Sequence, residues 1–400
     1  MNHPVSSLQS FAREKLADIY AQGLLRRHRT VDGPQGPLLT VNGRDMLNFC
    51  SNDYLGLAGH PALKEAMKKG IDRYGVGAGA SRLMCGHTSA HARLEERLAQ
   101  FTQRDRALVF STGYMANLAL VNVFSRKSGV IIGDRLNHAS LIDAALLAGA
   151  KLRRYQHADT RSLREALEKT GAGNCRLVVT ETVFSMDGDI APLPEMAGIC
   201  REAQVALLVD DAHGFGVLGK NGGGALEHFG LDMQEVPLMM ATFGKALGAF
   251  GAFVAGEADL IECLVQSGRT YIYTTALPPA LAETACCALD LVERERWRVV
   301  HLQQLVERFR MGALRQGLRI ADSITPIQPL LVGNSRRATE LSEALFAQGI
   351  FVAAIRPPTV PKNTARLRIS LTAAHTEGQI DQLLSVLSDL IQANHVHKPS

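Results

Sequence analysis

Short apolar runs alternate with longer segments of helical periodicity through most of the chain. Six runs have the length and aliphatic content of buried strands: residues 107–110, 130–132, 177–181, 206–209, 238–242 and 252–255. The segments between them are mostly long enough to form helices. This alternation predicts an α/β fold in which helices cover a mostly parallel sheet.

The pattern differs at both ends of the chain. Residues 7–28 follow roughly a helical stripe, and residues 38–49 predict a hairpin that turns through Asn42-Gly43. A long helical pattern covers about 280–316. Beyond it we expect strands at 327–332, 351–355 and 366–371, with helices near 339–348 and from Glu377 onward. We therefore expect an arm over residues 1–50, a large domain over 51–285, and a small α+β domain over 286–400 that includes the linking helix.

Composition and charge narrow the class of protein. The 400 residues are 46% hydrophobic and 20% charged, which is ordinary for a globular chain. The formal charge of +4 comes from basic residues interspersed with acidic ones, so we do not expect nucleic acid as a partner. No apolar run is long enough to span a bilayer, so we expect no membrane as a partner. The seven cysteines show no C-x-x-C spacing, and the first residues contain no apolar targeting segment. These features predict a cytoplasmic protein with buried thiols.

Lys245 has small and apolar neighbours directly after a predicted strand. The apolar neighbours Phe243, Ala246 and Leu247 keep water away from the lysine, which disfavours its charged form. Its amine therefore becomes available as a nucleophile. Such a lysine suits a Schiff base with an aldehyde cofactor, pyridoxal phosphate (PLP). A lone lysine at a strand end is far more often an ordinary residue whose amine reaches solvent. The interpretation therefore depends on a second motif.

That second motif is residues 209–214, in which Asp210 ends the apolar run 205–209 and His213 follows three residues later. Open α/β sheets bind ligands at the carboxyl ends of their strands. A carboxylate at this edge could keep the ring nitrogen of PLP protonated, with His213 beside it. The two motifs together favour a PLP site.

A site for the cofactor's phosphate is predicted where the strand at 107–110 leads into a helix at Gly113 and Tyr114. Free N–H groups at a helix start bind anions, although a simple Ser/Thr cap without a ligand is the alternative. The glycine-rich residues 75–79 follow no apolar strand, so we interpret them as a loop near the mouth of the site and not as a dinucleotide fingerprint.

Two further candidates follow predicted strands. His138 could stack on a flat ring or act as an acid or base, and the hydroxyl of Ser185 could reach the phenolic oxygen of the cofactor. Taken alone, His138 could equally cap a helix, and Ser185 could be a turn residue. Asp187 and Asp189 have no accompanying histidine or third acid, so we predict no metal site.

Six stretches, residues 48–57, 79–83, 181–189, 209–214, 242–245 and 354–361, carry a resemblance to a known family. On these residues the chain resembles the α-oxoamine synthases, which are fold-type-I PLP-dependent transferases. The resemblance implies a large domain with a mostly parallel seven-stranded sheet and a smaller α+β C-terminal domain. The last stretch, together with residues 134–140, resembles most the acyltransferases of biotin biosynthesis. It implies condensation of L-alanine with a pimeloyl thioester, carried by coenzyme A or by an acyl carrier protein, with loss of carbon dioxide.

The resemblance also implies roles for individual residues at the cofactor. Lys245 would form the Schiff base and Asp210 would pair with the pyridinium nitrogen. His138 would stack over the ring and complete the catalytic set. The other implied cofactor contacts are Gly113, Tyr114, Ser185, His213 and Thr242.

Substrate and subunit contacts are implied in the same way. Arg26, His138, Arg356 and Thr359 match substrate-binding positions, and the Arg356 guanidinium would pair with the amino-acid carboxylate. Arg27 is adjacent to Arg26, so the choice between these two arginines stays open. The residues 274–275 resemble a segment that reaches the phosphate of a neighbouring subunit, which implies a homodimer.

Three alternatives remain at this point. Another α-oxoamine synthase would condense glycine or serine with a different acyl-CoA. An aminotransferase on the same fold would exchange amino groups with a keto acid without releasing carbon dioxide. A non-enzymatic protein that has kept the fold would show no spectral change with alanine.

Overall fold

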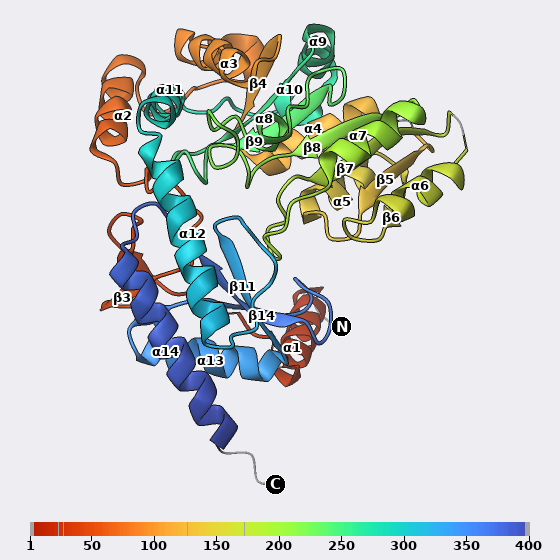
Figure 1. Ribbon diagram of the computed structural model, residues 1–400. Coiled ribbons are helices and arrows are strands. Elements are labelled where there is room, and N and C mark those ends of the chain that lie inside the picture. Colours follow the sequence, from red (N-terminus) through yellow and green to blue (C-terminus); the bar gives the residue numbers. More distant parts are fainter. Residues whose placement is uncertain (1–3, 23, 27, 126, 172, 397–400) are drawn as a thin grey trace.

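A seven-stranded sheet forms the centre of the larger body of the protein (Figure 1). The computed structural model describes residues 4–22, 24–26, 28–125, 127–171 and 173–396. The strand order is β4-β10-β9-β8-β7-β5-β6. The strands are β4 (Arg106–Phe110), β5 (Val130–Asp134), β6 (Lys151–Tyr155), β7 (Cys175–Glu181), β8 (Ala206–Asp210), β9 (Leu238–Thr242) and β10 (Ala252–Gly256). Only β10 is antiparallel to its neighbours. The expected α/β class and mostly parallel seven-stranded sheet are confirmed.

Helices cover both faces of this sheet because its strands carry apolar side chains on both sides. One face packs against α4 (Gly113–Phe124), α5 (Ala139–Leu147), α9 (Ala258–Ser267) and α10 (Arg269–Ile272). The other face packs against α3 (Ser89–Thr102), α6 (Thr160–Glu168), α7 (Leu193–Glu202) and α11 (Pro279–Arg294), with α2 (Pro61–Tyr74) packed on α11 and α8 (Ala225–Phe229) also in this core. Along β8, Leu207 and Val209 face one core and Leu208 faces the other. This alternation matches strands buried on both faces.

One strand of the sheet, β6, was not predicted from the sequence. β6 contains Lys151, Arg153 and Arg154, so it lacks the aliphatic run that marks its neighbours. It occupies an edge of the sheet and pairs only with β5. Charged residues are common on edge strands because they discourage pairing with other chains.

The smaller body contains a three-stranded sheet, β11-β14-β13, and most of the residues beyond 297 (Figure 1). Its strands are β11 (Ile327–Gly333), β13 (Ala353–Ile355) and β14 (Ala365–Ser370), and its helices are α12 (Trp297–Arg315), α13 (Ser335–Ala347) and α14 (Glu377–Val396). A second small sheet joins β1 (Val31–Asp32), β2 (Leu38–Val41) and β3 (Arg44–Asn48) with β12 (Ile350–Phe351). The hairpin expected through Asn42-Gly43 is confirmed, and both residues have positive φ.

Two expected elements are divided in the structure. The helix predicted over 280–316 is two helices, α11 and α12, that separate at Glu295 and Arg296. Arg296 donates from its guanidinium to the Lys220 carbonyl and the Asn221 side chain, which holds the break in place. The strand predicted over 351–355 is also divided, because β12 and β13 belong to different sheets.

The loop that follows β7 joins the two bodies. Arg366 of β14 forms an ion pair with Asp187. The hydroxyls of Ser323 and Thr325 donate to the Gly188 carbonyl at 2.8 and 2.9 Å. The carboxyl edge of the large sheet therefore faces the smaller body, and residues from both reach the space between them.

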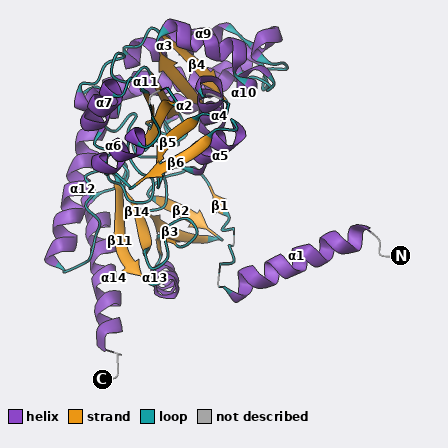
Figure 2. Ribbon diagram, turned by 90° about the vertical axis from the view of Figure 1, so that its right-hand side faces the viewer, coloured by secondary structure: helices purple, strands orange, loops and turns teal. Residues whose placement is uncertain are grey.

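The first helix, α1 (Pro4–Ala21), extends away from the rest of the chain (Figure 2). Its apolar residues Leu8, Phe11 and Tyr20 are more than half exposed. No helix in the described part of the chain is both long and apolar enough to cross a bilayer.

Candidate active site

Three neighbouring parallel strands end in, or lead directly to, an ionisable residue. Glu181 is the last residue of β7, Asp210 is the last of β8, and Lys245 follows the end of β9 by three residues. β7 and β8 pair in register with Glu181 opposite Asp210. These side chains therefore meet at the carboxyl edge of the sheet, the usual place for a ligand in an open α/β fold.

The Asp210 carboxylate is buried, with only 5% of the residue exposed, and it is held from two sides. Asn117 of α4 donates from Nδ2 to Oδ2 at 2.8 Å, and the backbone N–H of Ala212 donates to Oδ1 at 3.0 Å. Asn117 also donates to Ser140 of α5. The helices on this face thus fix a carboxylate that can pair with a protonated ring nitrogen.

Lys245 is half-buried in the turn after β9. Burial lowers the pKa of its amine to about 8, although attraction to Asp210 and Glu181 opposes that change. The turn is closed by a 3.0 Å hydrogen bond from Gly248 N–H to the Lys245 carbonyl. Gly248 has φ +62°, and a Cβ there would lie 2.3 Å from the Ala58 nitrogen, so only glycine fits. The structure therefore holds an easily deprotonated amine in a fixed turn.

His213 is buried beside this group. Its Nδ1 lies 2.7 Å from Oη of Tyr54. Burial lowers the pKa of His213 well below its ordinary value, and the positive charge of Lys245 acts in the same direction. The imidazole is therefore neutral at neutral pH, and the contact with Tyr54 fixes its orientation.

The start of α4 offers donors for an anion. Thr112 caps the helix by accepting a hydrogen bond from Met115 N–H at 3.2 Å. The N–H groups of Gly113 and Tyr114 lie in the first turn, where no intrahelical acceptor exists. The helix cap expected at this place is present, and an anion bound there would face these two N–H groups.

His138 and Ser185 lie at the same edge of the sheet. His138 caps α5, since its Nδ1 accepts from Ser140 N–H at 3.3 Å, yet its side chain is exposed and accessible to a ligand. His138 also contributes to the lowered pKa of His213, so the two side chains lie near one another. Ser185 is half-buried, and its carbonyl accepts a hydrogen bond from Arg368.

The threonines expected at the phosphate differ in their environment. Thr242 ends β9, and its hydroxyl donates to the Gly251 carbonyl at 2.8 Å while accepting from Gly244 N–H at 3.2 Å. It would have to rotate to donate to a phosphate. Thr274 is half-buried and Thr275 is exposed, and Thr275 pairs with Ser81 through an isolated bridge.

The expected substrate residues lie outside the buried group around Lys245. Arg26 is exposed beyond α1, and Arg27 lies outside the described residues. Arg356 is half-buried directly after β13, and Thr359 is exposed in the loop that follows. Ala353 of β13 lies opposite Arg368 of β14. Arg356 follows Ala353 by three residues, so its backbone lies roughly 10 Å along the strand direction from the position opposite Arg368.

Arg368 is a functional candidate that the sequence interpretation missed. It is buried, with 7% exposed, and donates to the Ser185 carbonyl at 2.6 Å and to Asn52 at 3.0 Å. Its positive charge lowers the pKa of both Lys245 and His213. Among the described residues, no carboxylate forms an ion pair with Arg368. An arginine inside an otherwise buried strand is unusual, and this signal could have found it.

Asn117, Tyr54 and Glu181 were missed as well. Tyr54 lies in residues 48–57, which carry the family resemblance, but neither that stretch nor the helix of Asn117 assigns these two residues a role. Their importance comes from long-range contacts with His213 and Asp210. Glu181 had a visible signal, since it ends an apolar strand in the same way as Asp210.

The residues gathered here match the chemical groups of PLP. An amine suits its aldehyde, a buried carboxylate suits its ring nitrogen, and the first turn of α4 suits its phosphate. The buried Oε1 of Glu181 and Oδ1 of Asn117 have no hydrogen-bond partner among the described residues, which is typical of a site built around another molecule. The group therefore fits this cofactor.

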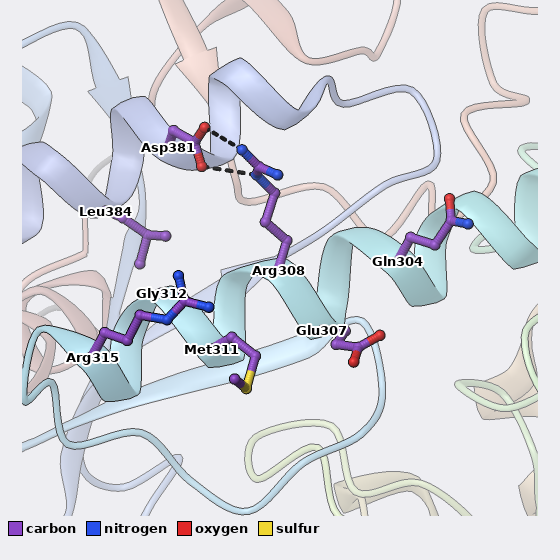
Figure 3. Close-up of a pocket in the computed structure, with 8 residues that line it drawn as sticks. All are labelled: Gln304, Glu307, Arg308, Met311, Gly312, Arg315, Asp381 and Leu384. Atoms are coloured by element: carbon purple, nitrogen blue, oxygen red, sulfur yellow. Dashed lines mark hydrogen bonds and ion pairs between the residues drawn. The ribbon is translucent and has the colours of Figure 1, made fainter.

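A separate surface hollow lies between α12 and α14 in the smaller body (Figure 3). There Arg308 pairs with Asp381 through two hydrogen bonds of 2.9 and 2.6 Å. None of the residues that line this hollow belongs to the group around Lys245. The part of the chain that the structure describes also contains no cluster of His, Cys, Asp and Glu that could hold a metal.

Comparison with known proteins also supports a PLP site. The family model "Aminotransferase class I and II" matches residues 44–387. An 8-amino-7-oxononanoate synthase of Thioalkalivibrio sulfidiphilus is 56% identical over 367 residues, which is 92% of this chain and 94% of that protein.

Solved structures show a similar fold over nearly the whole chain. A serine palmitoyltransferase from S. paucimobilis with bound PLP and myriocin has a TM-score of 0.91 and 28% identity, covering 99% of this chain and all of that one. An 8-amino-7-oxononanoate synthase from Francisella tularensis has a TM-score of 0.77 and 34% identity, covering 88% of this chain and 99% of that one.

Proposed function

Because the chain belongs to the class I and II aminotransferases and, among them, to the 8-amino-7-oxononanoate synthases, we propose that it condenses L-alanine with a pimeloyl thioester. The products are 8-amino-7-oxononanoate, carbon dioxide and the free thiol carrier, and the reaction is a PLP-dependent acyl transfer of biotin biosynthesis. The observation that carries this proposal is the meeting of Lys245 and Asp210 at the carboxyl edge of the sheet. The acyl carrier is coenzyme A or an acyl carrier protein.

The residues around Lys245 would hold the cofactor. Lys245 would bind its aldehyde carbon, and Asp210 would hold a proton on its ring nitrogen. His138, on the exposed side, would lie over the ring. The remaining proposed contacts are Gly113, Tyr114 and Thr242 to the phosphate, and Ser185 and His213 to the phenolic oxygen.

The chemistry requires a proton to leave Cα of alanine. When bound, PLP withdraws electrons from that carbon. The lowered pKa of Lys245, about 8, leaves an appreciable fraction of its amine uncharged near neutral pH, so Nζ can accept the Cα proton and later return it. Asp210 stays in place during this exchange because Asn117 and Ala212 hold both of its oxygens.

Two arginines are candidates for binding the amino-acid carboxylate. Arg356 is the partner expected for the amino-acid carboxylate, while Arg26 and Thr359 would contact the acyl chain or its carrier. Arg368 is a second candidate for the amino-acid carboxylate, since it is buried beside Ser185 and carries an uncompensated charge.

We propose a homodimer as the active form. Met84, Tyr273 and Phe250 are large apolar side chains that are at least half exposed. The segments of Met84 and Tyr273 are neighbours, because Ser81 pairs with Thr275 and the N–H of Ala276 donates to the Ala80 carbonyl. Such an exposed apolar surface suits an interface between subunits. We also propose that the chain divides into an arm over residues 1–50, a large domain over 51–285 and a small domain over 286–400. We propose a cytoplasmic location for the protein.

Product analysis tests the substrate assignment. Purified protein is incubated with PLP and with each combination of alanine, glycine or serine and a pimeloyl, short-chain or long-chain thioester. We expect carbon dioxide release and the mass of 8-amino-7-oxononanoate only with alanine and the pimeloyl thioester. A preference for serine with a long acyl chain would instead support a second candidate function, the condensation of serine with a long-chain acyl thioester. The TM-score of 0.91 to a serine palmitoyltransferase is the observation that favours this candidate.

A further inference from the structure

The loop after β7 carries Ser185, whose hydroxyl is the proposed contact to the phenolic oxygen of PLP. We call residues 184–189 the Ser185 loop. Two backbone hydrogen bonds close it: Phe184 N–H donates to the Asp189 carbonyl at 3.0 Å, and Gly188 N–H donates to the Phe184 carbonyl at 2.8 Å. The loop is therefore compact, and the residues at its base, Phe184 and Asp189, set the place from which Ser185 projects.

The tip of the Ser185 loop is held by the smaller body. Arg368 donates to the Ser185 carbonyl at 2.6 Å, and Arg366 forms an ion pair with Asp187. The Gly188 carbonyl accepts two further hydrogen bonds from the same body. These contacts fix the tip relative to the smaller body, whereas the proposed cofactor residues that follow β8 and β9 belong to the larger one.

His157 holds the base of the loop from the larger body. It follows β6 by two residues, and its Nε2 lies 2.9 Å from Oδ2 of Asp189. Its Nδ1 lies 3.0 Å from Oδ1 of Asp134, the last residue of β5. The ring of Phe184 packs edge-on against the imidazole, with centroids 4.3 Å apart. Both residues at the base of the loop therefore contact one side chain that is itself tied to the sheet.

The two carboxylates define the state of the His157 ring. Asp134 is 1% exposed, and its two oxygens accept from Leu136 N–H and Ala158 N–H, each at 2.8 Å, so it is an ionised acceptor. A carboxylate at each ring nitrogen requires an N–H on both, so the imidazole is protonated and bridges two negative charges. The other oxygen of Asp189, Oδ1, has no hydrogen-bond partner among the described residues, so the contact with His157 orients this carboxylate.

We propose that His157 is a positioning residue of the cofactor site: by holding Phe184 and Asp189, it fixes the Ser185 hydroxyl at the carboxyl edge of the large sheet. The Glu181 carboxyl also accepts from the Ser185 N–H, so the contacts of His157 act together with this bond. The inference rests on the proposed contact between Ser185 and PLP, and it concerns a residue that does not itself touch the cofactor.

Hydrogen–deuterium exchange measures the position of the loop in the full-length chain freed of PLP. Exchange of the backbone amides in residues 182–190 is followed by mass spectrometry in the wild type and in His157→Gln, which is polar but carries no charge. Peptides from β10 report the stability of the whole sheet. The matched control is His228→Gln, since the ring of His228 also packs edge-on against a phenylalanine, Phe229, but lies on α8.

We expect exchange in residues 182–190 to be about fivefold or more faster in His157→Gln, with a smaller change in β10. His228→Gln should leave residues 182–190 at the wild-type rate. Wild-type exchange of the loop in His157→Gln would overturn the proposal. Equal acceleration of the loop and β10 would overturn it too, because His157 would then support only the general stability of the fold.

Asp189→Asn provides a second test if His157→Gln does not fold. The side chain of Asp189 is 29% exposed, so the fold should tolerate an amide there. Because this variant weakens the same contact from the other side, it should accelerate exchange in residues 182–190 and leave β10 nearly unchanged. Wild-type exchange of the loop in Asp189→Asn would contradict the proposal.

PLP affinity, measured by fluorescence titration, tests whether His157 acts through Ser185. We expect His157→Gln to weaken PLP binding about three- to tenfold in the wild-type background and not further in Ser185→Ala, which lacks the hydroxyl. The same loss in both backgrounds would overturn the proposal, because His157 would then affect PLP by another route. Unchanged affinity in Ser185→Ala alone would refute the proposed contact of Ser185 with PLP, whereas the exchange experiment judges His157 without the cofactor.

Discussion

Oη of Tyr54 lies 2.7 Å from Nδ1 of His213, and both side chains are buried. Tyr54 comes from the segment after β3, whereas His213 follows β8, so this contact joins the N-terminal part of the chain to the carboxyl edge of the sheet. It fixes the ring of a neutral histidine.

The variant Tyr54→Phe should release His213 from this orientation. We expect a loss of about 1 kcal/mol in the free energy of unfolding, measured in urea, and a severalfold weaker affinity for PLP, measured by fluorescence titration. Tyr20→Phe changes an exposed tyrosine on α1 and should have neither effect. Unchanged PLP affinity in Tyr54→Phe would contradict a role for His213 at the cofactor.

Asp210→Asn should bind PLP but lose activity. The amide keeps the size of the side chain but cannot hold a proton on the ring nitrogen, so we expect at least a roughly hundredfold slower exchange of the alanine Cα proton with deuterium. Proton NMR in heavy water follows this exchange without the acyl substrate. Asp232→Asn, at an exposed position, serves as control. Exchange at the wild-type rate in Asp210→Asn would refute its assignment.

The two candidate arginines are separated by their lysine variants. A planar guanidinium can bind a carboxylate through two hydrogen bonds, and lysine cannot. If Arg368 binds the amino-acid carboxylate, Arg368→Lys should raise the KM for alanine about tenfold or more, and Arg356→Lys should change mainly the KM for the pimeloyl thioester. The opposite pattern in steady-state kinetics would return the alanine carboxylate to Arg356.

His157 should make stability depend on pH. Its Nδ1 lies 3.0 Å from Asp134 and its Nε2 lies 2.9 Å from Asp189. Burial alone lowers the pKa of His157, but hydrogen bonds to Asp134 and Asp189 outweigh it and raise the pKa to about 10. The folded pKa lies above the ordinary value of 6.5. The charged histidine therefore stabilises the fold fully below pH 6.5, and this contribution is lost as the pH rises toward 10.

Unfolding in urea at several pH values checks this linkage. The difference in unfolding free energy between the wild type and His157→Gln should be largest below about pH 6.5 and shrink toward pH 10. His28→Gln replaces an exposed histidine and should show no such trend. A difference independent of pH would mean that His157 is not charged in the folded protein.

The sequence predicts those parts of the fold that local patterns determine. β4, β5 and β7 to β10 are visible because each contains an aliphatic run, and most of these runs are separated by helical segments. β6 is not visible, since Lys151, Arg153 and Arg154 suit its place at the sheet edge and give no apolar signal. The break between α11 and α12 has no Gly or Pro and depends on Arg296 reaching the turn at residues 220–221.

The candidate site divides in the same way. Asp210 and Lys245 can be found from the chain alone because they follow apolar strands whose ends meet at one edge. Arg368 is visible in the sequence as an arginine within a predicted strand, but its place at the site is clear only from its contacts with Asn52 and the Ser185 carbonyl, which come from distant segments. Asn117 and Tyr54 cannot be found in this way, because their contacts with Asp210 and His213 join segments that are far apart in the sequence.

The proposed function depends most on Lys245 as the residue that binds PLP. Reduction of the PLP-loaded enzyme with borohydride, followed by proteolysis and peptide mass mapping, tests it most directly. We predict a single phosphopyridoxyl group on the peptide that contains Lys245, and none in Lys245→Ala, which should also lack turnover. A group on another lysine, or no group on any peptide, would contradict the account.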